Sequence, residues 1–95
     1  MTDPDRGWTV FCQEEAAADL HAMPRPLFDA VLRYLIRFAT EAGDAIDLGA
    51  PPPGSPRDPE HLRYDHTIPG HPVIIEYLVV RDIREFRITT VLWLG

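Results

Sequence analysis

The stretch VIIEYLVVRDIREFRITTVLWLG, residues 73–95, decides which fold this sequence can form. Its first part, Val73–Val80, is apolar except for Glu76, a pattern typical of a central strand covered on both faces for most of its length. After a turn at Arg81-Asp82 the residues alternate from 85 to 94, which predicts a second strand. One face of that strand is predicted to carry Phe86, Ile88, Thr90, Leu92 and Leu94. With a further strand at 61–68 and a turn at Pro69-Gly70, the C-terminal third is predicted to be an antiparallel sheet.

The pattern upstream of this sheet is helical. Leu27, Val31 and Leu35 recur at helical spacing, which predicts an amphipathic helix closed by Gly43. A shorter helix is predicted at residues 13–22, and residues 8–12 have the β-branched and aromatic side chains of a strand. The predicted fold class is α+β, with an N-terminal strand and two-helix hairpin packed on a C-terminal antiparallel sheet, in the order β-α-α-β-β-β.

The 95 residues are predicted to form a single domain, because this length is close to the commonest size of one domain. Residues 1–7 are predicted to be a flexible lead. Residues 44–60 contain Pro51-Pro52-Pro53 and two further prolines, so they are predicted to be a Pro-rich loop. Such a loop can serve as a polyproline ligand, but a stiff connector from helix to sheet is the favoured interpretation.

The charges argue against nonspecific nucleic-acid binding. All nine basic residues are arginine, and they face fifteen acids for a net charge of −6. Residues 1–56 carry four arginines against nine acids, and residues 57–95 carry five against six. A protein that binds a nucleic-acid backbone normally shows a basic patch. Here such a patch could only be local.

The sequence also indicates a compartment. Cys12, the single cysteine, cannot form an internal disulfide and fits a reducing environment. No stretch approaches the roughly 20 apolar residues of a membrane span, and the acidic N-terminus is unlike a signal peptide. We therefore predict a cytoplasmic protein with no membrane partner.

Neither a metal nor a cofactor is expected. His61, His66 and His71 are spaced by five residues, which in one strand would place His66 on the opposite face from the other two. Zinc needs ligands that converge, usually from closer spacing. A phosphate loop, a dinucleotide fingerprint and a nucleophile elbow are all absent from the sequence.

Two parts of the sequence nevertheless contain residues that could take part in binding or catalysis. In the segment Arg63–His66, arginine could bind phosphate, Tyr64 could stack on a base and His66 could transfer a proton, although a polar edge strand explains the pattern more simply. Glu76 interrupts an apolar run, and a buried carboxylate must be paired or have a raised pKa. Pairing with Arg63 or Arg87 across the sheet is favoured over a role as general base.

The order of these motifs resembles that of RelE/ParE-type toxins. Trp8–Phe11, Glu15–Leu20 and Met23-Pro24 are similar to the family's opening strand and helical hairpin. Four later segments are similar to its three-stranded sheet: Arg63-Tyr64, Pro69-Gly70, Val73–Val80 and Ile88–Gly95. The resemblance covers residues 8–95.

The resemblance implies a toxin of a bacterial toxin–antitoxin pair, of the kind that cuts messenger RNA on the ribosome or poisons DNA gyrase. If such a protein is an enzyme, it is a metal-independent endoribonuclease. By position, Arg63 corresponds to a basic residue on the family's first sheet strand. If the protein is active, the predicted site residues are Arg63 and Arg87 for phosphate, His66 for proton transfer and Tyr64 for stacking. The family's basic residue in the central strand is replaced here by Val73 or Ile74, which, with the acidic charge, weighs against action on RNA or the ribosome.

The leading functional hypothesis is a toxin-like component that binds a cognate antitoxin. The alternative is a non-catalytic protein-interaction module on the same fold. That module would bind a partner protein, or a second copy of the chain, through its sheet edge or the Thr89–Trp93 face.

Overall fold

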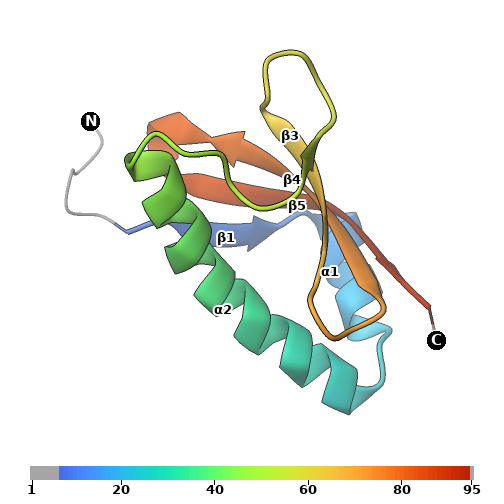
Figure 1. The fold of residues 1–95 in the computed structure, drawn as a ribbon. Helices are drawn as coiled ribbons and strands as arrows, with labels where there is room; N and C mark the ends of the chain where they lie inside the picture. The colour runs from blue at the N-terminus through green and yellow to red at the C-terminus, as the bar shows by residue number, and fades with distance from the viewer. Residues whose placement is uncertain (1–6, 95) are drawn as a thin grey trace.

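The computed structural model describes residues 7–94. Of the flexible lead predicted for residues 1–7, all but Gly7 lies outside the described residues. The main elements are β1 (Thr9–Cys12), α1 (Glu14–His21), α2 (Arg25–Asp47), β2 (Ser55–Pro56), β3 (Arg63–Thr67), β4 (Val73–Val80) and β5 (Glu85–Trp93) (Figure 1). The predicted α+β class and the order β-α-α-β-β-β are confirmed, with the two-residue strand β2 as an addition.

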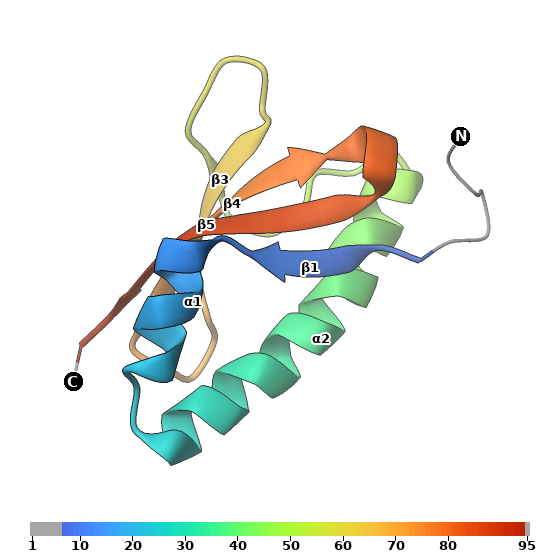
Figure 2. The same cartoon turned by 180° about the vertical axis from the view of Figure 1, so that it is seen from behind.

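The strands form one mixed sheet in the order β1-β5-β4-β3-β2. The three C-terminal strands β3, β4 and β5 pair antiparallel, as predicted, whereas β1 pairs parallel with β5. A parallel pairing needs a long crossover, which the two helices supply. Figure 2 shows β1 at the edge of the sheet beside β5.

Strand β4 is central but is covered on one face only, so the prediction of burial on both faces is wrong. Val73, Ile75, Tyr77 and Val79 are at most 5% exposed, whereas Ile74 on the other face is 44% exposed. A continuous apolar run does not distinguish these cases, because apolar side chains also occupy much of a protein's surface.

Helix α2 extends beyond the predicted end at Gly43 and stops at Asp47. Gly43 is buried inside the helix, where its missing side chain leaves room for the ring of Trp8. The Pro-rich loop therefore begins at residue 48 rather than 44, and Ser55 and Pro56 within it pair with β3. Proline is tolerated there because β2 is an edge strand.

Strand β5 contains a β-bulge that overturns part of the predicted alternation. Glu76 pairs with Thr90 and Tyr77 pairs with Ile88, so Thr89 is the extra residue. Side chains beyond the bulge change face. Val91 is therefore buried with Phe86 and Ile88, while Leu92 is 61% exposed.

The hydrophobic core lies between the helices and one face of the sheet. Phe38 of α2 packs edge-on against Tyr77 and Phe86, at ring-centroid distances of 5.0 and 5.2 Å. Helix α1 adds Ala16 and Leu20 to the same cluster. We call the opposite face, which carries Arg63, Glu76, Leu78, Arg87 and Thr89, the open face.

Neither helix within residues 7–94 has the combination of length and hydrophobicity that spans a membrane.

Candidate functional site

The four residues predicted to carry activity lie on two different faces of the sheet. Arg63 and Arg87 lie on the open face, whereas Tyr64 and His66 face the helices. The reason is the alternation of side chains along a strand, since neighbouring residues of β3 must point in opposite directions. The structure therefore brings Arg63 and Arg87 onto one surface and does not bring Tyr64 or His66 to it.

Arg63 and Arg87 lie in one row across the open face. Both are register partners of Leu78, from β3 and from β5 respectively. Their backbones are thus two strand spacings apart, about 10 Å. Such a separation suits two contacts along an extended ligand better than a shared grip on one phosphate.

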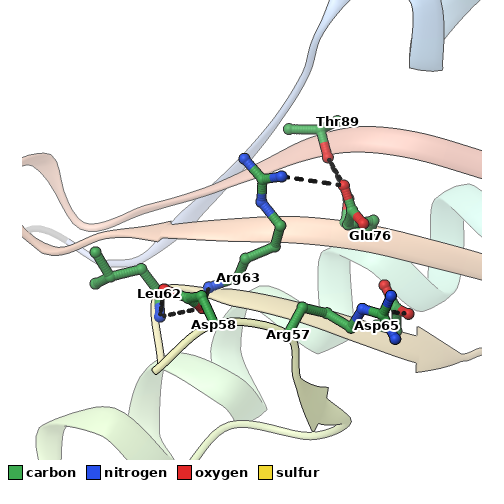
Figure 3. A network of polar contacts seen from close by, with 7 residues as sticks. All are labelled: Arg57, Asp58, Leu62, Arg63, Asp65, Glu76 and Thr89. Carbon is green, nitrogen blue, oxygen red and sulfur yellow. Dashed lines mark hydrogen bonds and ion pairs between the residues drawn. The ribbon is translucent and has the colours of Figure 1, made fainter. Parts of the chain in front are cut away.

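Glu76 lies in the middle of a small polar network on this face (Figure 3). Its Oε1 accepts a hydrogen bond from Thr89 Oγ1 at 3.1 Å and lies 4.0 Å from Arg63 Nη1. The bulge places Thr89 there. Of the two predicted partners of Glu76, the structure pairs it with Arg63, while Arg87 pairs with Glu85. The carboxylate is not buried, because 28% of its side chain is exposed.

The backbone of Arg63 is held by the loop before it. The Asp58 carboxylate accepts hydrogen bonds from the backbone N–H of Arg63 at 2.8 Å and of Leu62 at 3.0 Å (Figure 3). These bonds favour the charged carboxylate and so lower the pKa of Asp58. His61 in the same loop has a φ of 56°, in the left-handed region that is uncommon for residues other than glycine.

Three arginines on or beside the open face, Arg57, Arg63 and Arg87, are each paired with a carboxylate. Arg87 Nη2 lies 2.8 Å from Glu85 Oε2, and Arg57 Nε lies 3.3 Å from Asp65 Oδ2. Together with Arg63 and Glu76, these pairs leave the surface without net charge. In such a pair the carboxylate can accept a proton and the guanidinium can stabilise an anion. A phosphate bound here would, however, have to compete with the existing pairs.

Tyr64 is buried in the core, and His66 is half-buried on the same, helix-facing side of the sheet. Tyr64 is 4% exposed and stacks on Tyr77 with ring centroids 5.5 Å apart. His66 Nε2 lies 2.6 Å from the hydroxyl of Tyr34. Burial lowers the pKa of His66 and raises the pKa of Tyr34, so we assign Tyr34 as the donor and the neutral imidazole as the acceptor.

An apolar groove between β1 and α2 was not predicted from the sequence. It measures about 450 Å³. Its lining residues are Trp8, Thr9, Val10, Cys12, Leu32, Leu35, Ile36, Ala39 and Thr40. Ile36 is 74% exposed and Leu32 is 37% exposed, although both are large and apolar. The available signal was the unusually wide apolar stripe of α2, which is broader than contact with the sheet requires.

The groove runs beside a strand edge that is free within residues 7–94. Strand β1 pairs only with β5, so its outer backbone groups face away from the sheet. Unpaired strand edges are templates for another chain. Groove and edge together offer both apolar contacts and backbone hydrogen bonds to a partner.

Within residues 7–94, no three His, Cys, Asp or Glu side chains lie close enough together to hold a metal ion.

No protein-family model and no curated protein sequence matches this chain. A search of solved structures finds a chain in the crystal structure of the toxin–antitoxin complex RelBE2 from Mycobacterium tuberculosis. The two chains align over 94% of this one and 100% of the other, with a TM-score of 0.70. This chain shares the fold of that chain of the RelBE2 complex. Sequence identity is 18%, so the likeness shows the fold alone and assigns no role to an individual residue.

Proposed function

We propose that this protein is the toxin-like component of a bacterial toxin–antitoxin pair, and that it binds a cognate antitoxin in the cytoplasm. The observation that carries the proposal is the apolar groove beside the edge of β1 that is unpaired within residues 7–94. The RelE-type fold supports it, because a solved structure that shares this fold is a toxin–antitoxin complex.

The groove suits an antitoxin segment in extended conformation. Such a segment would add to the sheet at β1, with main-chain hydrogen bonds for affinity and alternate side chains in the groove for specificity. Leu32 and Ile36 would lose their exposure to water in this complex. Burying apolar surface contributes roughly 25 cal/mol per Å² and provides the driving force for binding.

The test is growth of a bacterial host after tightly controlled induction, with and without the protein encoded next to this one. We expect the wild type to arrest growth and the neighbouring protein to restore it. Ile36→Glu should still arrest growth but resist rescue, because a charge in the groove disfavours the apolar contact. Leu48→Glu is the matched control, since Leu48 is 86% exposed and does not line the groove.

Three outcomes would count against this proposal. If the soluble wild-type protein does not arrest growth, this protein is not a toxin. If the neighbouring protein does not relieve the arrest, that neighbour is not the antitoxin. Equal rescue of Ile36→Glu and Leu48→Glu would place the antitoxin elsewhere on the surface.

For toxicity itself we propose the open face, with Arg63 and Arg87 binding phosphate and Glu76 accepting a proton. These groups are the minimum for metal-independent cleavage of RNA, which needs an activated 2′-hydroxyl and a cation near the developing charge. Tyr64 and His66, the other two predicted residues, would contribute through the stability of the core. RNA on the ribosome is the corresponding substrate.

Two variants separate these roles. Arg63→Ala/Arg87→Ala should abolish growth arrest and keep the thermal midpoint near that of the wild type, because both side chains are partly exposed. His66→Ala should lower the thermal midpoint and retain arrest at a temperature where it is folded. Arrest by the double variant would exclude the open face as the source of toxicity.

The second candidate function is a non-catalytic module that binds a protein or a second copy of the chain. It is favoured by the carboxylate partners of Arg57, Arg63 and Arg87, since these pairs neutralise the cations that RNA would need. No growth arrest, together with a dimer in sedimentation that Ile36→Glu dissociates, would establish self-association through the groove.

A further inference from the structure

A second, smaller cleft lies between α2 and the turn that joins β3 to β4. It measures about 230 Å³. The lining residues are Ala30, Arg33, Tyr34, Arg37, Pro69 and His71. None of them belongs to the open face or to the groove beside β1, so the cleft is independent of the proposed toxin function.

The cleft is positively charged in an otherwise acidic protein. Arg33 and Arg37 are one helical turn apart, and no acid is among the lining residues. Arg33 makes no ion pair within residues 7–94, while Arg37 lies 3.8 Å from Glu41 with both side chains more than 60% exposed. An exposed pair at this distance holds Arg37 weakly.

Two like charges at this spacing on a helix repel each other. By comparison, Arg84 and Asp47 lie 2.7 Å apart and Arg25 and Asp29 lie 3.0 Å apart, whereas Arg63 and Glu76 are as loosely paired as Arg37, at 4.0 Å. Arg33 and Arg37 are thus cations whose local neutralisation is incomplete. An anion between them would remove the repulsion.

The walls of the cleft are held in place before any ligand binds. The Arg37 guanidinium lies 5.6 Å from the centroid of the Tyr34 ring, and the Tyr34 hydroxyl is hydrogen-bonded to His66. The backbone of His71 donates to Ile68 at 3.2 Å and accepts from Val73 at 2.9 Å. His71 is itself half-buried and lines the cleft.

We propose that this cleft binds a phosphate group, either free or at the end of a small phosphorylated molecule. Guanidinium groups hold phosphate through two parallel N–H donors, and the imidazole of His71 supplies a further donor. The volume is below the roughly 300–1,000 Å³ of ordinary ligand pockets, which fits a phosphate rather than a whole cofactor.

The test is a titration of the isotope-labelled protein, followed by amide and arginine side-chain NMR at constant ionic strength. The probes are inorganic phosphate and adenosine 5′-monophosphate, with chloride and adenosine as controls. We expect saturable shifts confined to residues 30–37 and 68–73, with a Kd of about 1 mM, as expected of two charge-assisted contacts. Tighter binding of the nucleotide than of phosphate would identify a phosphorylated small molecule as the ligand, and equal binding would identify phosphate alone.

Arg33→Gln/Arg37→Gln should weaken binding by at least about tenfold, since each charge-assisted hydrogen bond contributes about that factor or more. Arg25→Gln is the matched control, because Arg25 is on the same helix, is 81% exposed and already pairs with Asp29. Shifts no larger than those with chloride, or equal binding by the double variant and the control, would overturn the proposal.

Discussion

Side-chain contacts of a few residues connect the N-terminal strand to the rest of the molecule. The Asp47 carboxylate accepts hydrogen bonds from Trp8 Nε1 at 3.1 Å and from Arg84 Nη2 at 2.7 Å. The Arg84 guanidinium lies 5.3 Å from the Trp8 ring, which also stacks on Phe86. One carboxylate thus joins the start of β1, the end of α2 and the turn between β4 and β5.

This arrangement predicts a pH-dependent stability. Hydrogen bonds from Arg84 and Trp8 lower the pKa of Asp47 in the folded protein. The stabilisation is therefore complete above the unfolded pKa of about 3.9 and is lost as the pH falls through the lower folded value. Asp47→Asn should lower the thermal midpoint at neutral pH, and the difference from wild type should shrink in acid. Asp44→Asn, an exposed change on the same helix, serves as the control and should show neither effect.

Gly43 gives a second prediction at this scale. A Cβ at this position would overlap the Trp8 ring and would lie 2.7 Å from Trp8 Cβ. Trp8 cannot move aside easily, because Asp47, Arg84 and Phe86 hold it. Overpacking costs about 1–3 kcal/mol, whereas replacing glycine by alanine in a helix gains about 1 kcal/mol. We expect Gly43→Ala to destabilise the protein by up to about 2 kcal/mol in urea denaturation. A gain in stability would contradict the close packing of Trp8 on this glycine.

At the scale of elements, the bulge in β5 determines which side chains reach the core. Val91 is 1% exposed and Leu92 is 61% exposed, the reverse of what strict alternation from Phe86 predicts. We expect Val91→Ala to reduce the free energy of unfolding by about 2 kcal/mol through loss of buried volume. Leu92→Ala, the matched neighbour, should stay within about 0.5 kcal/mol of wild type. The reverse ranking in urea denaturation would show that the strand has no bulge.

The sequence predicted the kind and order of most elements but not these local details. The bulge at Thr89 is invisible in the residue pattern, because Phe86 to Leu94 read equally well as an unbroken alternation. The extension of α2 past Gly43 was missed because glycine usually follows a helix, and here it serves a close contact instead. Among the predicted site residues, alternation separates Tyr64 and His66 from Arg63, and the wide apolar stripe of α2 indicated a groove only in hindsight.

At the scale of the whole molecule, one core joins the helices to the sheet. Trp8, which directly precedes the first strand, and Trp93, at the end of the last strand, both pack against that core. The radius of gyration is 13.1 Å, close to the roughly 13 Å expected for one domain of 100 residues. We therefore expect the chain to unfold as one cooperative unit.

The corresponding measurement uses single-tryptophan variants. In Trp93→Phe, the fluorescence of Trp8 should report the same urea midpoint as far-ultraviolet circular dichroism. Trp8→Phe should give coincident midpoints for Trp93 in the same way. An earlier transition for Trp8 would mean that β1 detaches before the core unfolds, and the single-domain interpretation would then fail for the N-terminal strand.

The residue pattern was sufficient for the α+β class, the two helices and the three C-terminal strands, because periodicity is a local property of the chain. It also indicated that Glu76 pairs with an arginine across the sheet, and the tertiary structure decided for Arg63 over Arg87. The placement of β1 beside β5, the separation of Arg63 from His66, the groove and the cationic cleft arose only in the tertiary structure. Each of these depends on which segments pack together over long distances in the sequence. Strand register and the bulge fix those contacts, and neither is encoded in the neighbouring residues alone.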